Sequence, residues 1–398
     1  MIKRTLETTL LGVSRQYPVT TLTGPRQSGK TTLVRNAFPN HDYASLEEPD
    51  QRALALEDPR GFLGQFGRKV ILDEVQRAPD LFSYIQTRVD ERGIAGQYIL
   101  TGSQDFLLMN KISQSLAGRA AILHLLPFSL SELEGRHPLT LSDIGKKMPT
   151  RKKNSIPDLY DVLFEGFYPR IHDKGLAPQR WLADYYKTYV ERDVRTVLNV
   201  GDVETFGRFV RLCAGRNGQL LNLSSLSNDC GVTHSTAKRW LSILETSFLV
   251  ILLRPHHRNF NKRIVKSPKL YFLDTGLLCY LLKIRSPGDV IHHASRGSIF
   301  ESFAVAELLK NYLNRGKEPD LYFWRDSTGH EVDVLIDVGG ELTPIEVKSG
   351  QTFAKDFIAD IQYWRTLAGR SSSAAAVIYG GDKSFRREDI AVYSWSCL

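Results

Sequence analysis

Residues 24–32 combine glycines, a lysine and hydroxyl side chains at spacings that suit phosphate binding. They are Gly24, Pro25, Arg26, Gln27, Ser28, Gly29, Lys30, Thr31 and Thr32. Glycines let a loop curl closely around phosphate groups, and N–H groups at the start of a helix donate to phosphate oxygens. In this pattern Lys30 reaches the terminal phosphates and Thr31 places its hydroxyl on Mg²⁺, while Arg26 is a further candidate phosphate contact. We therefore predict an ATP and Mg²⁺ site, against the alternative of a glycine loop that only joins a strand to a helix.

Further polar residues end two apolar runs downstream of this loop. Asp73 and Glu74 follow the run that ends at Leu72, and Ser103 follows the run that begins at Gln97. Because ligands of open α/β sheets bind beyond the carboxyl ends of the strands, these residues are expected to meet the glycine loop in one crevice. Asp73 is predicted to orient Mg²⁺ through its water shell, Glu74 to polarise the attacking water, and Ser103 to sense phosphate. The alternative for Asp73 and Glu74 is a solvated strand end.

Arg119 is a candidate catalytic cation. It follows the polar end of the third run, within Leu116-Ala117-Gly118-Arg119. An arginine delivered to the γ-phosphate accelerates phosphoryl transfer by roughly 10³–10⁵. Arg119 is predicted to act in its own chain or in a neighbouring subunit, and an ordinary surface or ion-paired arginine is an equal alternative.

A second set of charged residues lies near the C-terminal end. Polar and apolar residues alternate from 331 to 337, and Gly339-Gly340 is typical of a two-residue hairpin turn. Such a turn places Asp333 opposite Glu346, with Lys348 on the same face, because side chains alternate with period two. Opposed carboxylates repel unless a cation joins them, so Asp333 and Glu346 are predicted to bind a divalent metal, and Lys348 to stabilise charge on a phosphate. A structural hairpin with exposed charges is the alternative.

Residues 1–135 are predicted to form the α/β nucleotide-binding domain that positions the first site. The stretch 19–23 predicts a strand before the glycine loop, and 32–38 predicts a helix after it. The aliphatic run that ends at Leu72 suits a strand buried on both faces, as parallel sheets require. A Pro- and Lys-rich mobile linker is expected at 136–157 and a helical connector at 158–202. The connector contains a predicted ion-pair network of Glu191, Arg192 and Arg195.

Residues 203–285 hold the basic excess and are predicted to bind DNA. They contain 13 Lys or Arg and 4 Asp or Glu, while the whole chain has a net charge of +8. The pattern predicts helices at 224–229 and 235–246, then a hairpin of strands at 248–253 and 269–273. This order predicts a winged helix-turn-helix with Lys238 and Arg239 directed away from the buried face of its second helix. The connection between the two strands carries Arg254, Arg258, Lys262, Arg263 and Lys266. A winged helix that contacts protein is the alternative.

Length and composition exclude some classes of protein. A chain of 398 residues with 42% hydrophobic and 24% charged residues predicts a globular protein of several domains. No apolar run reaches the length of a membrane span, and the N-terminal residues lack an apolar export signal, so no membrane partner is expected. The four cysteines lie far apart without metal-ligand spacing, which favours a reduced, cytoplasmic setting.

The nucleotide motifs together resemble those of prokaryotic AAA-type ATPases that carry a C-terminal domain of unknown function. The glycine loop, Leu72-Asp73-Glu74-Val75-Gln76, Leu100-Thr101-Gly102-Ser103 and Leu116-Ala117-Gly118-Arg119 carry this resemblance, which covers nearly the whole chain. It implies an AAA fold, ATP and Mg²⁺ as ligands, and a homo-oligomer.

The charged hairpin resembles that of the PD-(D/E)XK nucleases, although Val332 stands where that family has proline. This resemblance implies that residues 286–398 form a nuclease-like α/β domain. It also implies that an acid on the preceding helix, here Glu301, is a further metal ligand, and that Gln362 is an accessory residue.

The sequence therefore predicts an α/β protein: a P-loop AAA-type parallel-sheet ATPase domain, a helical and winged-helix region, and a C-terminal α/β PD-(D/E)XK nuclease-like domain. The predicted function is Mg²⁺-dependent ATP hydrolysis coupled to DNA binding, with DNA cleavage left open. The alternative is a nucleotide-gated DNA- or protein-binding regulator whose nuclease-like domain is inactive.

Overall fold

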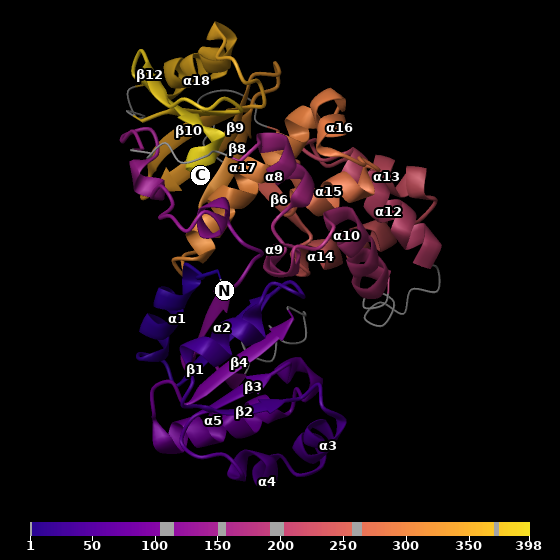
Figure 1. Cartoon of the computed structure of the whole chain (residues 1–398), viewed down its shortest axis with the longest axis vertical. Helices are drawn as coiled ribbons and strands as arrows, with labels where there is room; N and C mark the ends of the chain where they lie inside the picture. Colours follow the sequence, from indigo (N-terminus) through magenta and orange to yellow (C-terminus); the bar gives the residue numbers. More distant parts are fainter. Residues whose placement is uncertain (1, 104–114, 150–156, 192–202, 257–264, 370–373) are drawn as a thin grey trace. The chain divides into compact units, whose positions relative to one another are not determined.

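The computed structural model describes residues 2–103, 115–149, 157–191, 203–256, 265–369 and 374–398 (Figure 1). The chain divides into two compact units. The first unit comprises residues 1–128, 246–248 and 312–318, and the second comprises the remainder. Within the described residues, no helix is both long enough and apolar enough to cross a membrane.

The first unit has an α/β fold with a five-stranded sheet (Figure 1). Its strands follow the order β2-β3-β4-β1-β5, and all neighbouring pairs are parallel. The prediction of a parallel-sheet α/β domain is confirmed. Its elements are α1 (Leu6–Ser14), β1 (Val19–Gly24), α2 (Lys30–Ala37), β2 (Asp42–Ser45), α3 (Pro49–Glu57), α4 (Pro59–Gly64), β3 (Val70–Asp73), η1 (Val75–Arg77), α5 (Leu81–Arg92), β4 (Tyr98–Ser103) and β5 (Ala120–His124).

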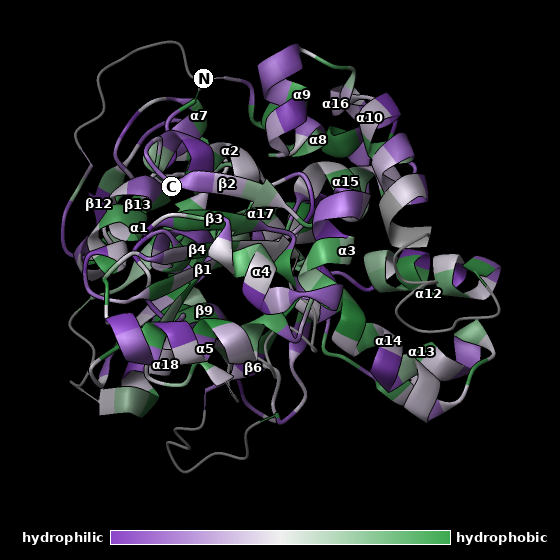
Figure 2. Cartoon of the chain, turned by 90° about the horizontal axis from the view of Figure 1, so that it is seen from below, coloured by the Kyte–Doolittle hydropathy of each residue, from purple (hydrophilic) through white to green (hydrophobic). Residues whose placement is uncertain are grey.

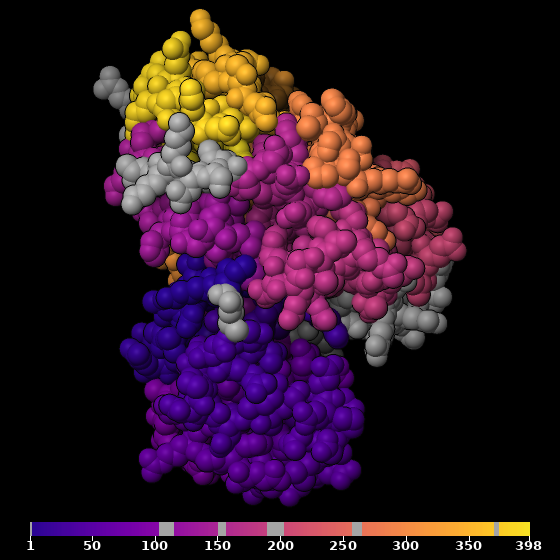
Figure 3. Space-filling view, in the orientation of Figure 1, coloured from indigo at the N-terminus to yellow at the C-terminus, as the bar shows by residue number. Residues whose placement is uncertain are grey.

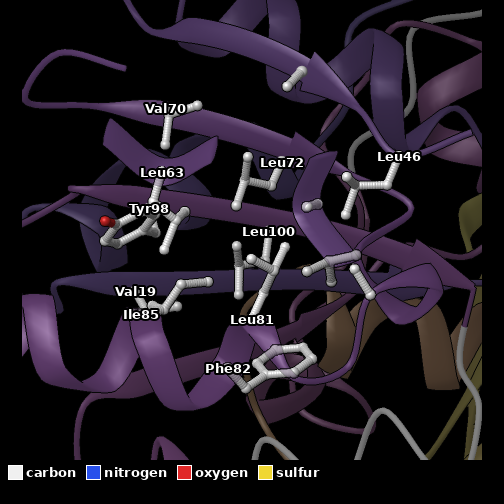
Figure 4. Close-up of a cluster of buried hydrophobic side chains, with 14 of the residues drawn as sticks. Val19, Leu46, Leu63, Val70, Leu72, Leu81, Phe82, Ile85, Tyr98 and Leu100 are labelled. Atoms are coloured by element: carbon white, nitrogen blue, oxygen red, sulfur yellow. The ribbon is translucent and has the colours of Figure 1, made fainter. Parts of the chain in front are cut away.

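Helices cover both faces of this sheet. Val70 and Leu72 pack with Leu81 and Ile85 of α5, whereas Ile71 between them packs with residues of α1 and α2. Figure 4 shows the side chains of the first cluster between the strands and α5. Each buried Leu or Ile contributes roughly 1.5–3 kcal/mol, so the two clusters fix the carboxyl ends of the strands where the polar residues follow.

The second unit begins with short helices and continues into a large mixed sheet. In the space-filling view of Figure 3, magenta, orange and yellow mark its successive parts. Its elements before the C-terminal strands are α7 (Leu130–Leu133), η2 (Leu141–Asp143), α8 (Leu159–Glu165), α9 (Pro169–Lys174), α10 (Pro178–Tyr185), the π-helix η3 (Tyr186–Glu191), α12 (Val203–Gly215), α13 (Leu223–Cys230), α14 (His234–Thr246), β6 (Val250–Pro255), β7 (Lys269–Phe272), α15 (Thr275–Leu281) and α16 (Pro287–His292). The later elements are α17 (Arg296–Leu313), β8 (Leu321–Arg325), β9 (Glu331–Val338), β10 (Glu341–Lys348), η4 (Lys355–Ile358), α18 (Ala359–Ala368), β11 (Ala376–Tyr379), β12 (Phe385–Arg387), β13 (Ile390–Ser394) and η6 (Trp395–Cys397).

Helices α12 and α14 pack through aromatic rings ahead of the β6–β7 hairpin. The Trp240 ring of α14 contacts Phe206 and Phe209 of α12 at centroid distances of 5.3 and 5.4 Å. Gly231 ends α13 in the left-handed region (φ 71°), which forms the turn into α14. Figure 2 shows hydrophobic and hydrophilic residues alternating along α13 and α14. Leu220, between α12 and α13, forms an antiparallel bridge with Lys269 of β7.

The sheet of the second unit has eight strands in the order β12-β13-β11-β10-β9-β8-β6-β7. Strand β6 pairs with β7 on one side and with β8 on the other. One continuous sheet therefore crosses the position, between residues 285 and 286, at which the sequence predicts a domain boundary. Sequence patterns define each strand but not which distant strand pairs with an exposed edge.

Strands β9 and β10 form the predicted hairpin. Glu341 pairs with Val338 and Ile345 pairs with Val334, on either side of Gly339 (φ 63°) and Gly340 (φ 89°). Positive φ at both turn residues is typical of a two-residue hairpin turn. The predicted register is confirmed over this ladder.

Residues 136–149 differ from the expected mobile linker because they pack within the second unit. Leu141 and Ile144 are buried. The Tyr393 hydroxyl accepts from the N–H of Gly145 at 2.9 Å and donates to the carbonyl of Lys147 at 2.7 Å. Two buried side chains and these backbone contacts anchor a segment that has no regular apolar period. Some predicted features lie outside the described residues: the rest of the linker at 150–156, Arg192 and Arg195 of the ion-pair network, and Arg258, Lys262 and Arg263 of the basic hairpin.

Candidate functional site

The glycine loop joins β1 to α2 at the carboxyl edge of the parallel sheet. Gly24 has φ 150°, and a Cβ atom there would lie 2.1 Å from the carbonyl oxygen of Leu125. Gly29 has φ 90° and directly precedes the first residue of α2. Neither backbone position accepts a larger side chain without strain. The tight turn leaves the first N–H groups of α2 without partners inside the helix, which is the arrangement that binds anions.

Lys30 is the buried cation of this loop. Its Nζ donates to the carbonyl oxygens of Gly24 at 3.0 Å and Pro25 at 2.8 Å. Burial lowers the pKa of Lys30 to about 8, although the carboxylates of Glu74 and Asp73 act in the opposite direction. Carbonyl dipoles replace only part of the hydration that the ammonium group loses on burial. The loop therefore favours an anionic ligand next to Lys30.

Asp73 is held by three hydroxyl groups from three elements. Thr31 Oγ1 donates to Asp73 Oδ2 at 2.8 Å, and the Tyr43 hydroxyl donates to the same oxygen at 3.0 Å. Thr101 Oγ1 donates to Oδ1. The structure thus brings Thr31 and Asp73 together as the sequence predicts, and adds Tyr43 and Thr101. An oxygen-rich pair of hydroxyl and carboxylate suits Mg²⁺.

Glu74 adopts the left-handed conformation, with φ 56° and ψ 41°. This backbone geometry costs a residue with a side chain of order 1–3 kcal/mol, and such strain is concentrated at functional sites. Glu74 Oε2 accepts a hydrogen bond from Gln76 Nε2 at 2.5 Å. The strained turn after β3 therefore holds a second carboxylate next to Asp73.

The other predicted loop residues occupy different environments. Ser28 is buried, and its Oγ has no hydrogen-bond partner within the described part of the chain. Arg26 is half-buried and adds to the lowering of the Lys30 pKa, while Gln27 and Thr32 are exposed. The backbone of Ser103 lies in register with Gly24 across the β1–β4 pair.

Four carboxylates of the second unit meet around two lysines. We call Glu301, Glu331, Asp333 and Glu346 the carboxylate cluster. Lys348 Nζ lies 2.7 Å from Glu346 Oε2 and 3.9 Å from Asp333 Oδ2. The second of these oxygens also accepts from the N–H of Val347 at 2.9 Å. The structure therefore brings Asp333, Glu346 and Lys348 together, as the hairpin register predicts.

Strand β7 adds two residues to this cluster that sequence reasoning missed. Lys269 is buried, forms an ion pair with Glu331, and lies 3.9 Å from Asp333 Oδ1. Tyr271, two residues later and hence on the same face, donates to Glu301 Oε2 at 3.3 Å. A signal is present in the sequence, since Lys269 and Tyr271 are the alternate polar residues of an otherwise apolar strand.

The electrostatics of the cluster favour an ionised Asp333 beside protonated Glu301 and Glu346. Burial and the charge of Asp333 raise the pKa of Glu301 to about 8 and raise that of Glu346 well above its usual range. Against the effect of burial, Lys269 and Lys348 lower the pKa of Asp333. At neutral pH the buried negative charge is thus matched by lysine ammonium groups.

The predicted metal ligands Glu301, Asp333 and Glu346 are close together, and the ammonium groups of two lysines lie 3.9 Å from the two oxygens of Asp333. Within the described ranges, no group of three or more His, Cys, Asp or Glu is arranged so that it could hold a metal ion. Glu346 Oε1 is nevertheless buried and has no hydrogen-bond partner among the described residues. Gln362, the expected accessory residue, lies outside the cluster and donates to Glu388 Oε2 at 3.1 Å.

Most of the first unit is similar to a known family. Residues 16–134, which include the glycine loop, Asp73 and Glu74, match the family described as an AAA domain. Residues 16–134 are called the AAA domain below, after the family that they match. Residues 156–288 and 296–398 match two domains of unknown function, DUF8612 and DUF4143.

Relatives extend over most of the chain. The uncharacterized proteins Mb2031c of Mycobacterium bovis and Rv2008c of Mycobacterium tuberculosis are each 29% identical over 383 residues, which cover 94% of this chain and 79% of each relative. Among solved structures, the Walker-type ATPase PABY2304 of Pyrococcus abyssi has 14% identity and a TM-score of 0.46, with 71% of this chain and 96% of that chain covered. AMPPCP-bound DnaA from Aquifex aeolicus has 16% identity and a TM-score of 0.29, with 60% and 85% covered. At these TM-scores the solved structures indicate nothing about function.

Arg119 lies at the amino-terminal end of the parallel strands of the AAA domain, whereas the glycine loop follows the carboxyl end of β1. It directly precedes β5, which runs parallel to β1 with Val19 beside Ala120 and Thr23 beside His124. Arg119 forms an exposed ion pair with Asp90 of α5, with Nε 2.5 Å from Oδ1 and Nη2 2.9 Å from Oδ2. The prediction that Arg119 acts on the nucleotide of its own chain is therefore corrected, because five strand residues, about 16 Å, separate it from the loop. Action on a neighbouring subunit remains a prediction.

Two further contacts support the glycine loop of the AAA domain and have no sequence signal of their own. The buried Arg4 donates to the carbonyl oxygens of Ser28 at 3.0 Å and Leu126 at 2.6 Å. His124 Nδ1 lies 2.7 Å from the hydroxyl of Thr23, the residue before Gly24. Burial lowers the pKa of His124 to about 4, so the ring is neutral at physiological pH.

Proposed function

We propose that the AAA domain binds and hydrolyses ATP with Mg²⁺. The observation that carries this proposal is the hydrogen bond from Thr31 to Asp73, next to a buried Lys30 whose ammonium group donates to two backbone carbonyl oxygens. Lys30 and the N–H groups at the start of α2 would hold the phosphates, and Thr31 and Asp73 would hold Mg²⁺. When bound, this ion neutralises charge on the β- and γ-phosphate oxygens. Glu74 would orient the attacking water and accept its proton.

The test is ATP turnover by the Lys30→Ala variant. Removal of the lysine is expected to abolish hydrolysis without loss of the folded state, since within the described part of the chain its side chain bonds only to backbone carbonyl oxygens. Lys69→Ala, which changes an exposed lysine of the same unit, is the control. Hydrolysis at the wild-type rate by Lys30→Ala would reject the site.

We further propose that α12 to β7 act as a winged helix that binds DNA through α14. The order of helices, the Leu220–Lys269 bridge and the β6–β7 hairpin support this assignment. The α14 face formed by Ala237, Trp240, Leu241 and Leu244 is buried, whereas Lys238 and Arg239 are exposed. Exposed cations on a second helix can contact phosphates in the major groove.

Salt dependence tests this DNA proposal. Each phosphate contact contributes about 0.9 to the slope of log K against log salt concentration on duplex DNA. Changing both Lys238 and Arg239 to Ala should therefore reduce the slope by about 2. The matched control, Lys355→Ala, removes an exposed lysine elsewhere in the second unit. Affinity that does not fall with added salt would instead favour a winged helix that contacts protein.

For the carboxylate cluster we propose a nuclease-like role in which Asp333 and Glu346 bind a divalent cation and Lys348 contacts phosphate. The donor set is suitable because carboxylate oxygens are hard ligands, and the unpartnered Glu346 Oε1 leaves one of them available. The alternative is a nucleotide-gated regulator with an inactive nuclease-like domain, and the lysines that already compensate the carboxylates favour it. DNA cleavage with Mg²⁺ or Mn²⁺ by wild type, Asp333→Ala and Lys348→Ala distinguishes the two. Equal cleavage by all three would indicate a contaminant.

A further inference from the structure

The two lysines of the carboxylate cluster differ in origin and in exposure. Lys348 lies in β10, beside the carboxylates of its own hairpin, and its side chain is 34% exposed. Lys269 comes from β7, in the β6–β7 hairpin, and its side chain is 4% exposed. Although burial acts to lower it, the carboxylates of Glu301, Asp333 and Glu331 raise the pKa of Lys269. Lys269 is therefore a charged group enclosed by the cluster.

Lys269 and Lys348 each lie within ion-pair distance of one oxygen of Asp333. Lys269 Nζ lies 3.9 Å from Oδ1, and Lys348 Nζ lies 3.9 Å from Oδ2. Lys269 also pairs with Glu331, the other carboxylate of β9 in the cluster. A divalent cation bound to these same oxygens would lie within a few ångströms of the Lys269 ammonium. Two positive charges at that separation repel strongly where water is excluded.

We propose that Lys269 is an internal cation that competes with a divalent metal for the carboxylate cluster. Metal entry then requires the Lys269 side chain to leave Asp333 and Glu331. In the structure the lysine occupies the cluster, which explains why the carboxylates are adjacent and yet do not form a metal-binding group. This inference rests on the proposed nuclease-like role of the cluster, to which it adds a control on metal entry.

Contacts at the end of β7 hold the Tyr271–Glu301 side of the cluster independently of the Lys269 side chain. Asn217 Oδ1 accepts from the N–H of Phe272 and from Ser302 Oγ, both at 2.9 Å, and Asn217 Nδ2 donates to the carbonyl of Ser298 at 2.8 Å. These bonds join the end of β7 to α17 on both sides of Glu301. Lys269 is the first residue of β7, away from this anchor. Rotation of its side chain therefore leaves the Tyr271–Glu301 contact in place.

The proposed competition makes the winged helix part of the metal site. Lys269 belongs to the strand that pairs with β6 and forms the bridge to Leu220. A displacement of the first residue of this strand would withdraw the competing charge. The same chain segment that is proposed to contact DNA would then control whether the cluster accepts a cation.

The test compares Mn²⁺ affinity, measured by calorimetry without nucleotide, in wild type and Lys269→Met. The variant removes the competing charge and keeps a side chain of similar length. It is expected to bind Mn²⁺ at least tenfold more tightly than wild type. Lys269→Arg should behave like wild type, and so should Lys266→Met, which changes an exposed lysine three residues away. Adding Asp333→Asn to Lys269→Met should abolish the gain, which assigns the added affinity to this cluster.

A second measurement on the wild-type chain applies even if Lys269→Met does not fold. Amine acetylation read by mass spectrometry should label Lys269 slowly without metal and at least threefold faster with saturating Mn²⁺, while labelling of Lys266 stays constant. Unchanged labelling of Lys269, or Mn²⁺ affinity in Lys269→Met equal to or below that of wild type, would overturn the inference. Neither readout uses DNA cleavage or ATP hydrolysis. A chain that binds Mn²⁺ as expected but cuts no DNA would reject the nuclease role and leave the competition intact.

Discussion

The hydroxyl of Thr31 lies 2.8 Å from Oδ2 of Asp73. This bond joins the first turn of α2 to the end of β3, two elements separated along the chain by β2, α3 and α4. Because Tyr43 and Thr101 also donate to Asp73, the carboxylate is oriented before any ligand binds. A ligand that replaces the Thr31 bond therefore meets a carboxylate that needs little rearrangement.

Lys30→Met is expected to stabilise the nucleotide-free chain and to abolish nucleotide binding. The folded-state pKa of Lys30, about 8, lies below the ordinary value of 10.5. Stability therefore rises with pH between about 8 and 10.5, and the burial cost is fully present at pH 7. Methionine removes this cost, so the free energy of unfolding at pH 7 should rise by roughly 2 kcal/mol.

Urea unfolding of the Lys30→Met variant, with and without ATP and Mg²⁺, provides the measurement. Wild type should gain stability from the nucleotide, whereas the variant should gain none. Lys69→Met, on the surface of the same unit, should resemble wild type in both conditions. A variant less stable than wild type would contradict the view that Lys30 is under-compensated.

Glu74 should separate hydrolysis from binding. Glu74→Gln keeps the shape of the side chain and removes the base, so ATP turnover should fall by at least 100-fold while nucleotide affinity changes by less than threefold. Glu74→Gly should lose turnover too, but should gain roughly 1 kcal/mol of stability because glycine accepts φ 56° without strain. Single-turnover hydrolysis and thermal unfolding are the two measurements. Full turnover by Glu74→Gln would remove Glu74 from the mechanism.

His124 should make the chain less stable in mild acid. Its pKa is about 4 in the folded chain and 6.5 ordinarily, so the unfolded chain binds the proton first as the pH falls. Stability should therefore decline between about pH 6.5 and pH 4, with a loss of about 2 kcal/mol at pH 5 relative to pH 7.5. In His124→Gln this part of the decline should disappear. Equal pH dependence of unfolding in the variant and the wild type would contradict the assignment.

Arg119 is predicted to act on the nucleotide that a neighbouring subunit binds. Neither Arg119→Ala nor Lys30→Ala is expected to hydrolyse ATP alone, but their mixture should regain part of the wild-type rate because each variant supplies what the other lacks. Nucleotide affinity of Arg119→Ala should stay within twofold of wild type, since Arg119 lies at the amino-terminal end of the strands and the glycine loop at their carboxyl end. A mixture with no regained turnover would leave Arg119 as the surface partner of Asp90.

Local patterns predicted the glycine loop and the C-terminal hairpin well, for a physical reason. Gly24 and Gly29 are needed for backbone angles that few other residues adopt, and Gly339-Gly340 specifies its own turn. The buried face of α14 follows from helical spacing alone. In each case the signal and the structure it specifies lie within a few residues of each other.

The features that the sequence did not reveal depend on contacts between distant segments. Lys269 counts as one of the basic residues of 203–285, but the pairing of β6 with β8 makes its strand part of the C-terminal sheet, where it is buried among carboxylates. Arg119 comes after the end of β4 in the chain but directly precedes the parallel strand β5. It therefore lies at the amino-terminal end of the strands, away from the glycine loop. Neither the count of charged residues nor their order in the chain reveals the burial of Lys269 or the position of Arg119, because both depend on which strands pair.

Short segments from late in the chain complete the first unit. Residues 246–248 and 312–318 belong to it, the Phe248 ring lies 5.5 Å from the His124 ring, and Thr9 Oγ1 donates to the carbonyl of Asn314 at 2.9 Å. Synthesis of the first 128 residues thus leaves the nucleotide-binding half unfinished on the ribosome until residue 318 has emerged. A gene fragment that ends at residue 128 should consequently yield a less stable first unit than the full chain does.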